Sequence, residues 1–346
     1  MTVTRTRPVI ALRYDLRATG FGAAHADLFA AMLDQASYAD QQGLDRVHVS
    51  EHHHAPDGYL PSVFVALAAI AARTSRVRIR PSALVLPLHD PVRIAEDAAV
   101  LDVISNGRLD LTVGAGYRKI EFQMLGRSFA DRGTRLRRAL TFLREAWTGE
   151  PCVFEERPVL VRPVPVTPGG PKIIMGGSTP KTARRAAEIA DGYDPASPSL
   201  IEDYLAACAD IGRQPGECLP RVGPFFLFVS DDPERSRAAL GRHVQHEMRQ
   251  YAAWGRQSDL LSAPTDIPLE EVWTVGSHQV VTPEDAVDLI RGFGPDSLLT
   301  LHPLCGGLPP DLANASLQLF VEKVLPEIDR EPAQSADGER RERWTL

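Results

Sequence analysis

The sequence predicts an α/β protein and, within that class, a (β/α)8 TIM barrel with extra loop insertions. Short runs rich in β-branched residues alternate with longer segments whose apolar residues recur at i, i+3 and i+4. Eight such strand–helix pairs fit within 346 residues, a length that one barrel domain can reach. An open, doubly wound sheet is the alternative arrangement for the same alternation.

The predicted elements follow one another in a regular order. Strands are expected over 8–14, 45–50, 77–86, 108–116, 172–177, 192–195, 221–230 and 296–303. Helices are expected over 25–42, 60–73, 91–104, 131–147, 179–190, 199–212, 232–256, 283–292 and 310–325. Caps support the boundaries, because Thr282 precedes a proline at a helix start and Gly43 and Gly107 stand where helices would stop.

Two segments exceed what a bare barrel needs. The proline-rich stretch 150–171 is expected to form an extended excursion or hairpin, and 257–282 a long irregular insertion. Long loops on a compact domain are commonly lids or binding loops. We predict one barrel domain over 1–329, followed by a polar tail over 330–346.

Composition narrows the classes of partner. The chain has 44% hydrophobic residues, a net charge of −7 and no lysine-rich or arginine-rich block, which argues against nucleic acid or anionic lipid as the main partner. No apolar stretch approaches the roughly 18 residues of a membrane span. The four cysteines are scattered, at 152, 208, 218 and 305, which is typical of a reduced compartment. A cytoplasmic protein is expected.

In a barrel the active site collects at the carboxyl ends of the strands. The residues at these ends are Asp15 and Arg17, Glu51 to His54, Pro87 to His89, Tyr117 and Arg118, Gly176 to Thr179, and His302. Three of the ends carry histidine, so chemistry near neutral pH is expected there.

The stretch "IIMGGSTPKT" predicts an anion site. Gly176 and Gly177 end a strand, and Ser178 and Thr179 open a helix whose free backbone N–H groups would attract a phosphate. The competing interpretation is that Ser178 or Thr179 only caps the helix.

The stretch "SEHHH" leaves several interpretations open. If strand geometry continues, His52 and His54 share one side, and Glu51 and His53 share the other. An H-x-H pair at a strand end can ligate a metal, as in a metal-dependent hydrolase. A solvated or structural run is the plain alternative. The favoured interpretation is a histidine that moves a proton over a bound organic cofactor.

Three stretches, in order and spacing, resemble the bacterial luciferase-like flavin-dependent oxidoreductases. They are "LDRVHVSEHHH", the long run from "ALAAIAARTSR" to "GAGYRKIEFQMLG", and "IIMGGSTPKTARRAAEIADGY". The resemblance covers about residues 40–195 and extends more weakly over the later strands. It implies a (β/α)8 barrel with extra loops, in agreement with the pattern of elements.

The resemblance also implies site residues. His52 matches the active-site histidine beside the flavin, and catalytic roles are expected for His52, Tyr117 and His302. Ser82 and Ala83 match a dipeptide that supports the flavin ring, often through a non-proline cis peptide. The expected cofactor-binding residues are Glu51, Ser82, Ala83, Gly116, Tyr117, Gly176, Gly177, Ser178 and Thr179, with no metal ligand.

The implied activity is a monooxygenase that uses reduced FMN (FMNH2) from a separate reductase, together with dioxygen, to oxidise a small organic substrate such as a secondary metabolite. A homodimer is also implied. Gly114 and Ala115 stand where luciferase has a reactive cysteine and then an arginine that meets the FMN phosphate. The missing cysteine argues against light emission, and the missing arginine argues against tight binding of the FMN phosphate unless Arg118, Lys181 or Arg184 compensates. A deazaflavin-dependent hydride transfer and a non-catalytic flavin-binding subunit are the alternatives.

Overall fold

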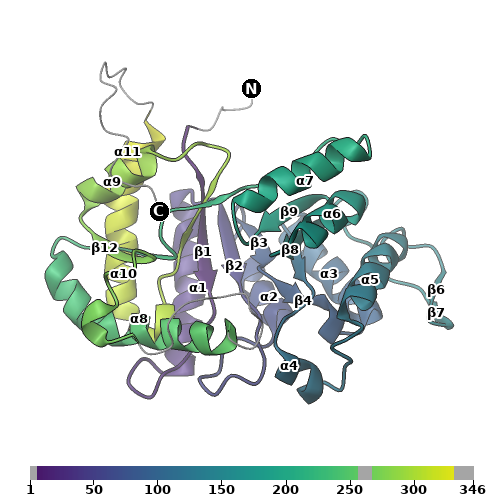
Figure 1. Ribbon diagram of the computed structural model, residues 1–346, viewed down its shortest axis with the longest axis horizontal. Helices are drawn as coiled ribbons and strands as arrows, with labels where there is room; N and C mark the ends of the chain where they lie inside the picture. Colours follow the sequence, from purple (N-terminus) through teal and green to yellow (C-terminus); the bar gives the residue numbers. More distant parts are fainter. Residues whose placement is uncertain (1–5, 256–266, 331–346) are drawn as a thin grey trace. The chain divides into compact units, whose positions relative to one another are not determined.

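The computed structural model of the protein describes residues 6–255 and 267–330 (Figure 1). Within these residues two compact units can be distinguished. Unit 1 comprises residues 6–35, 221–253 and 267–330, and unit 2 comprises residues 36–220 and 254–255. Each unit is built from parallel strands and helices that alternate along the chain.

Unit 2 contains consecutive parallel strands. β2 pairs with β3, Ile79 of β3 is bridged to Leu109 just before β5, and β4, β5, β8 and β9 pair in that order. A separate antiparallel hairpin is formed by β6 and β7. The strands are β2 (Arg46–Val49), β3 (Arg78–Pro81), β4 (Leu84–Val85), β5 (Asp110–Gly114), β6 (Cys152–Phe154), β7 (Arg157–Val159), β8 (Lys172–Gly177) and β9 (Gly192–Pro195).

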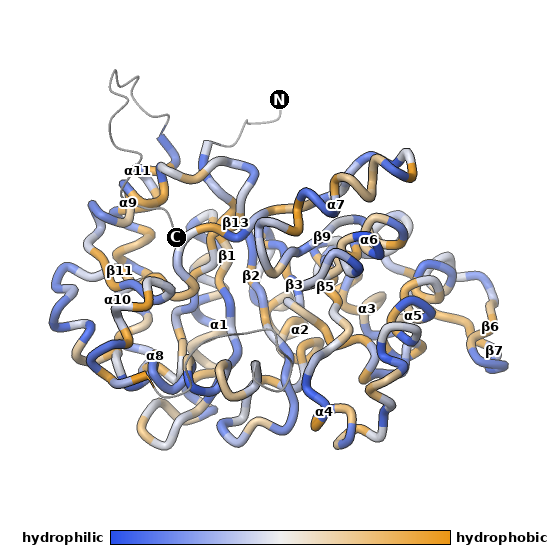
Figure 2. The backbone as a smooth tube through the Cα atoms, in the orientation of Figure 1, coloured by the Kyte–Doolittle hydropathy of each residue, from blue (hydrophilic) through white to orange (hydrophobic). Residues whose placement is uncertain are grey.

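Helices follow the strands of unit 2 and pack with apolar faces inward. On α5 the apolar side chains are buried while several arginines face outward, and Figure 2 shows this alternation along α5 and α6. The hairpin of β6 and β7 lies beyond α5 in Figure 1. The helices are α2 (Val63–Arg73), the 3-10 turn η1 (Leu86–Leu88), α3 (Pro91–Ser105), α4 (Lys119–Met124), α5 (Arg132–Ala146), α6 (Pro180–Ile189) and α7 (Ser199–Asp210).

Unit 1 contains β1 (Val9–Tyr14), β10 (Arg221–Val222), β11 (Phe226–Val229), β12 (His278–Val281) and β13 (Leu298–Leu301). β13 pairs in parallel with both β1 and β10, and β11 pairs in parallel with β12. Its helical segments are α8 (Pro233–Gly255), η2 (Leu269–Glu271), α9 (Pro283–Arg291), η3 (Cys305–Gly307), α10 (Pro310–Leu319), the π-helical turn η4 (Phe320–Val324) and α11 (Leu325–Asp329). Helix α1 (His25–Gln42) begins in unit 1, and α8 ends in unit 2.

The predicted helix boundaries have the expected local causes. The Thr282 side chain accepts a hydrogen bond from the backbone of Asp285 and so caps α9, with a proline at the first helical position. Gly43 and Gly107 follow α1 and α3 with φ of 82° and 77°, a conformation that glycine adopts without steric cost.

Four expectations about elements need correction. The strand predicted over 77–86 is divided into β3 and β4 by a cis peptide between Ser82 and Ala83, and that over 221–230 is divided into β10 and β11. The helical segment predicted to end at 325 continues to 329 through η4. Part of the segment predicted to be irregular, 257–282, forms β12, while its residues 257–266 lie outside the described residues.

The stretch 150–171 does contain the hairpin that was expected there. The tail from 331 onward lies outside the described residues, and a single domain over 1–329 stays a prediction. No helix in the described ranges combines the length and the apolar character needed to cross a membrane.

Candidate active site

The side chain of Glu51 anchors the segment that follows β2. Its Oε1 accepts hydrogen bonds from His53 Nε2 at 2.8 Å and from His89 Nε2 at 2.6 Å. Its Oε2 accepts the backbone N–H of Val85 at 2.6 Å. A carboxylate in this unprotonated form only accepts, so both histidines donate from Nε2. Glu51 therefore links the end of β2 to β4 and to the turn after η1.

Charge stabilises this arrangement. Burial alone would raise the pKa of Glu51, but the hydrogen bonds from His53 and His89, the charge of His89 and the Val85 N–H lower it to about 2. Burial lowers the pKa of His53, yet its hydrogen bond and attraction to Glu51 outweigh this and raise it. The network is therefore built around an ionised glutamate.

The imidazole of His52 is hydrogen-bonded to Glu121 and not to Glu51. Its Nδ1 lies 2.7 Å from Oε1 of Glu121, a buried residue of α4. Because the carboxylate accepts, Nδ1 carries a proton, so Nε2 is the acceptor whenever the ring is neutral and the second donor when it is protonated. The hydroxyl of Tyr117 lies 3.3 Å from that Nε2. His52 is thus held in one tautomer, with its reactive nitrogen beside a phenol.

Glu121 is held by two further contacts. Its Oε1 also accepts the backbone N–H of His53 at 3.1 Å and Nη1 of Arg118 at 2.8 Å. Burial raises the pKa of Glu121, but the hydrogen bond and charge of His52, the His53 N–H and the charge of Arg118 together lower it. Arg118 in turn donates to the carbonyl of His53 at 2.7 Å. The ion pair of Glu121 with Arg118 keeps the carboxylate charged beside His52.

Aromatic rings surround the His52 imidazole. Ring centroids lie 4.9 Å from it for Tyr59, 5.5 Å for Tyr117 and 4.7 Å for Trp254. Trp254 also receives the Arg118 guanidinium at 4.0 Å from a ring centroid. This packing fixes the ring plane of His52, and the Glu121 carboxylate fixes which edge it presents.

The neighbouring strands β4, β5 and β8 begin or end in small, half-buried residues. These are Ser82 and Ala83 immediately before β4, Gly114 to Gly116 at the end of β5, and Gly176 to Ser178 at the end of β8. An ideal Cβ on Gly114 would lie 3.6 Å from Cβ of Ala83, so β5 approaches the cis dipeptide closely. The side chains at these positions are small, so the flat ring system of a flavin or a deazaflavin would meet little steric hindrance from them.

The loop between β8 and α6 has a cap. Thr179 Oγ1 accepts the backbone N–H of Thr182 at 3.3 Å, and Thr182 Oγ1 donates to the carbonyl of Thr179 at 2.6 Å. Thr179 therefore performs the capping role that was the competing interpretation. The hydroxyl of Ser178 makes no hydrogen bond to the described part of the chain. Phosphate binding by Gly177, Ser178 and Thr179 stays a prediction.

His302 belongs to unit 1, whereas the other predicted site residues belong to unit 2. It follows β13 and is buried, with Nε2 at 3.4 Å from Asp15 and Nδ1 at 3.5 Å from Glu247. Glu247 also accepts a hydrogen bond from the thiol of Cys305 at 2.9 Å. Burial raises the pKa of that thiol, and the charge of Glu247 raises it further. His302 therefore has two carboxylate neighbours within its own unit.

The geometry separates the members of the histidine run. Glu51 and His53 do share a side, as strand alternation predicted. His54, however, is exposed and has a φ of 51°, so strand geometry ends before it and the H-x-H pair with buried His52 is not formed. Two other groups bring their ligand atoms within 4.8 Å, namely Glu51 with His53 and His89, and Glu247 with His302 and Cys305.

Sequence reasoning missed two partners of His52. Glu121 and Arg118 were not singled out as a pair, although their i, i+3 spacing just after a strand end was a usable signal. Trp254 has no local sequence pattern that indicates its contact with His52, because the two residues lie far apart in the chain.

The fold and the site define an α/β protein in which a buried histidine–carboxylate pair and the small residues of three strand ends belong to one unit. The chain belongs to the luciferase-like monooxygenase family, whose model matches residues 15–281. It is 27% identical over 349 residues to the F420-dependent glucose-6-phosphate dehydrogenase of Nakamurella multipartita, with 93% of this chain and 98% of that protein covered.

Solved structures share the fold of this chain. The monooxygenase RslO1 from Streptomyces bottropensis matches with a TM-score of 0.73 and 24% identity over 92% of this chain and 98% of its own. The oxygenating constituent of 3,6-diketocamphane monooxygenase from Pseudomonas putida, in complex with FMN, matches with a TM-score of 0.71 and 19% identity over 93% and 99%. The predicted TIM-barrel fold is thereby confirmed.

Proposed function

We propose that this enzyme is a monooxygenase that uses reduced FMN and dioxygen to oxidise a small organic substrate. The observation that carries the proposal is the buried His52–Glu121 pair, with the Tyr117 hydroxyl at the other ring nitrogen. It is supported by the small, half-buried residues Ser82, Ala83 and Gly116 at neighbouring strand ends.

The residues suggest how the chemistry proceeds. Reduced FMN, when bound, supplies the electrons that activate dioxygen, and Glu51, Ser82, Ala83, Gly116, Tyr117 and Gly176 to Thr179 would hold it. His52 Nε2 would accept a proton from the substrate or from Tyr117. The negative charge of Glu121 at 2.7 Å from Nδ1 would then stabilise the imidazolium. In unit 1, His302 is proposed to contact the substrate.

The second candidate is a deazaflavin-dependent dehydrogenase that moves a hydride without dioxygen. The observation that favours it is the full-length similarity to an F420-dependent dehydrogenase. A tricyclic deazaflavin would be held by the same small residues, Ser82, Ala83 and Gly116. In this case His52 would take the hydroxyl proton of an alcohol, while the hydride passes from the alcohol's carbon atom to the oxidised deazaflavin.

Separate titrations with reduced FMN and with the deazaflavin coenzyme decide between the candidates. We expect tight binding of reduced FMN, followed by oxygen consumption when substrate is added. Tight binding of the deazaflavin alone, with no oxygen uptake, would transfer the assignment to the dehydrogenase.

Replacing His52 by alanine tests whether the protein is catalytic at all. We expect kcat to fall about 10²-fold or more, because a positioned acid or base contributes about that much. The matched control is His54→Asn in the same segment, since His54 is exposed and asparagine tolerates its positive φ. Equal turnover in His52→Ala and the control would show that His52 is not catalytic, and absence of turnover in the wild type would support a non-catalytic flavin-binding subunit.

We also propose the cellular setting. A separate flavin reductase would supply reduced FMN transiently, and the loops around 150–171 and 257–282 would select the substrate. The four cysteines are free thiols, which supports a reducing compartment such as the cytoplasm. A homodimer is proposed through α2 and α3, where Val65, Val103 and Ile104 are exposed.

A further inference from the structure

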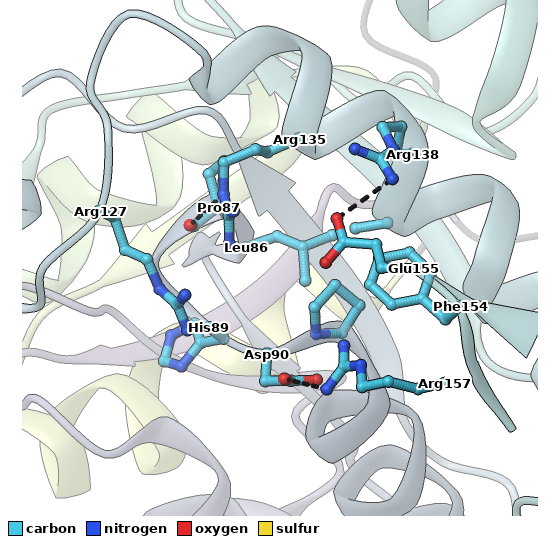
Figure 3. Close-up of a pocket in the computed structure, with 12 residues that line it drawn as sticks. Leu86, Pro87, His89, Asp90, Arg127, Arg135, Arg138, Phe154, Glu155 and Arg157 are labelled. Carbon is cyan, nitrogen blue, oxygen red and sulfur yellow. Dashed lines mark hydrogen bonds and ion pairs between the residues drawn. The ribbon is translucent and has the colours of Figure 1, made fainter. Parts of the chain in front are cut away.

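A pocket in unit 2 is lined by arginines that the proposed chemistry does not use (Figure 3). It is a depression open to solvent, of about 390 Å³ with that open solvent included, between the turn after β4, helix α5 and the hairpin of β6 and β7. Its lining includes none of the residues of the loop between β8 and α6, where the flavin phosphate is predicted. The charged side chains that line it are His89, Asp90, Arg127, Arg135, Arg138, Glu155 and Arg157.

Two of the four arginines already have carboxylate partners. Arg138 lies 3.1 Å from Glu155, and Arg157 donates to Asp90 at 2.7 Å. Figure 3 shows both pairs as dashed contacts at the rim of the pocket. Each pair is close to electrically neutral because its two charges are opposite. It contributes little to stability because its side chains are more than a third exposed.

Arg127 and Arg135 are different. Each donates its Nε to a backbone carbonyl, of Leu88 and Pro87 respectively, at 3.2 Å. Neither side chain makes another hydrogen bond or an ion pair within residues 6–255 and 267–330. Two adjacent carbonyls therefore anchor two half-buried guanidinium groups, whose terminal amino groups have no hydrogen-bond partner and which have no carboxylate within ion-pair distance among the described residues.

The rest of the wall suits an organic group. Phe154 contributes an aromatic ring, with the guanidinium carbons of Arg138 and Arg157 at 5.9 Å and 5.5 Å from its centroid. Leu86 and Pro87 add apolar surface. A ligand with a compact double negative charge and a small apolar body would match both parts of the pocket.

We infer that this pocket binds a small organic phosphate, whose dianionic group is held by Arg127 and Arg135 and whose carbon portion lies against Phe154. Guanidinium forks match the oxygen geometry of a phosphate and form short, charge-assisted hydrogen bonds to it. A dianion is favoured over a carboxylate because two positive charges lack partners. The inference does not depend on which flavin the enzyme uses.

Calorimetric titration of the purified full-length protein with phenyl phosphate, at low ionic strength, tests the inference. We expect binding that weakens at least about tenfold in the double variant Arg127→Gln/Arg135→Gln, because hydrogen bonds to a charged group are lost. The matched control is Arg93→Gln, since Arg93 lies on the exposed side of α3 and does not line the pocket. Titration with benzoate tests the preference for a dianion.

Further variants locate the bound phosphate. Ser178→Asp places a negative charge on the loop between β8 and α6 and is expected to leave phenyl phosphate binding unchanged. If the double variant does not fold by circular dichroism, Arg127→Gln alone is expected to weaken binding. Wild-type affinity in the arginine variants, tighter binding of benzoate, no binding at millimolar phenyl phosphate, or loss of binding in Ser178→Asp would each overturn the inference.

Discussion

At the scale of single residues, the environment of His52 is decided by one carboxylate. Glu121 Oε1 lies 2.7 Å from His52 Nδ1 and is itself held by Arg118 and by the backbone of His53. Three aromatic rings restrict the imidazole from other sides. Glu121 is therefore a positioning residue, which acts on the reaction only through His52.

Replacing Glu121 by glutamine tests this role. We expect kcat/KM to fall about 10²-fold, since the tautomer and orientation of His52 are no longer fixed. The limb of the pH–rate profile that reports His52 should move to lower pH, because the imidazolium loses its nearby negative charge. Glu121→Asp should restore part of the rate. An unchanged pH profile in Glu121→Gln would show that Glu121 is only structural.

Glu51 makes a different contribution, to stability. Glu51→Gln places an amide N–H against the Val85 N–H or a histidine donor, and leaves buried donors unpaired. We expect the free energy of unfolding at neutral pH to fall by about 3 kcal/mol. Urea unfolding measures this change, with Glu150→Gln at an exposed position as the control.

The pH dependence of this effect follows from the lowered pKa of Glu51. Because the folded-state value is about 2 and the ordinary value is 4.5, the stabilisation is present above pH 4.5 and is lost as pH falls toward 2. The difference in unfolding free energy between wild type and Glu51→Gln should therefore shrink between these pH values. A difference that stays constant there would show that the charge of Glu51 contributes nothing.

At the scale of elements, β-branched runs and helical periodicity predicted most boundaries to within a few residues. β2, α1, β8 and β9 are close to or at their expected limits because local pattern and tertiary packing favour the same structure. β12 was missed, since "HQVV" is short and follows a stretch rich in polar and loop-forming residues. Its pairing with β11 is a long-range contact that no local pattern indicates.

The turn from β8 to α6 leaves no space for a side chain at Gly177. A Cβ there would lie 2.2 Å from Thr182 Oγ1, the hydroxyl that completes the cap of α6. We expect Gly177→Ala to lower the free energy of unfolding by about 1–3 kcal/mol. Gly294→Ala is the control, because no atom lies within 4 Å of its Cβ, and chemical denaturation compares the two. Equal stabilities would show that the cap rearranges freely.

At the scale of the whole molecule, the proposed dimer can be tested by its mass in solution. Val65 is 71% exposed and Ile104 is 48% exposed, on helices that contact each other. We expect the double variant Val65→Asp/Ile104→Asp to have half the mass of the wild type by light scattering, because buried charges destabilise an apolar interface. Ile211→Asp, at another exposed apolar position, should leave the mass unchanged. A monomeric wild type would contradict the proposal.

The sequence by itself determined the fold class, the order of strands and helices, and the strand ends at which chemistry would gather. These depend on periodicity and caps, which are local properties of the chain. Only the tertiary structure decided which side chains meet. It paired His52 with Glu121 and Trp254, joined Glu51 to His89, separated His54 from His52 and brought four arginines around one pocket. Such contacts join residues far apart in sequence, so only the packed backbone specifies them.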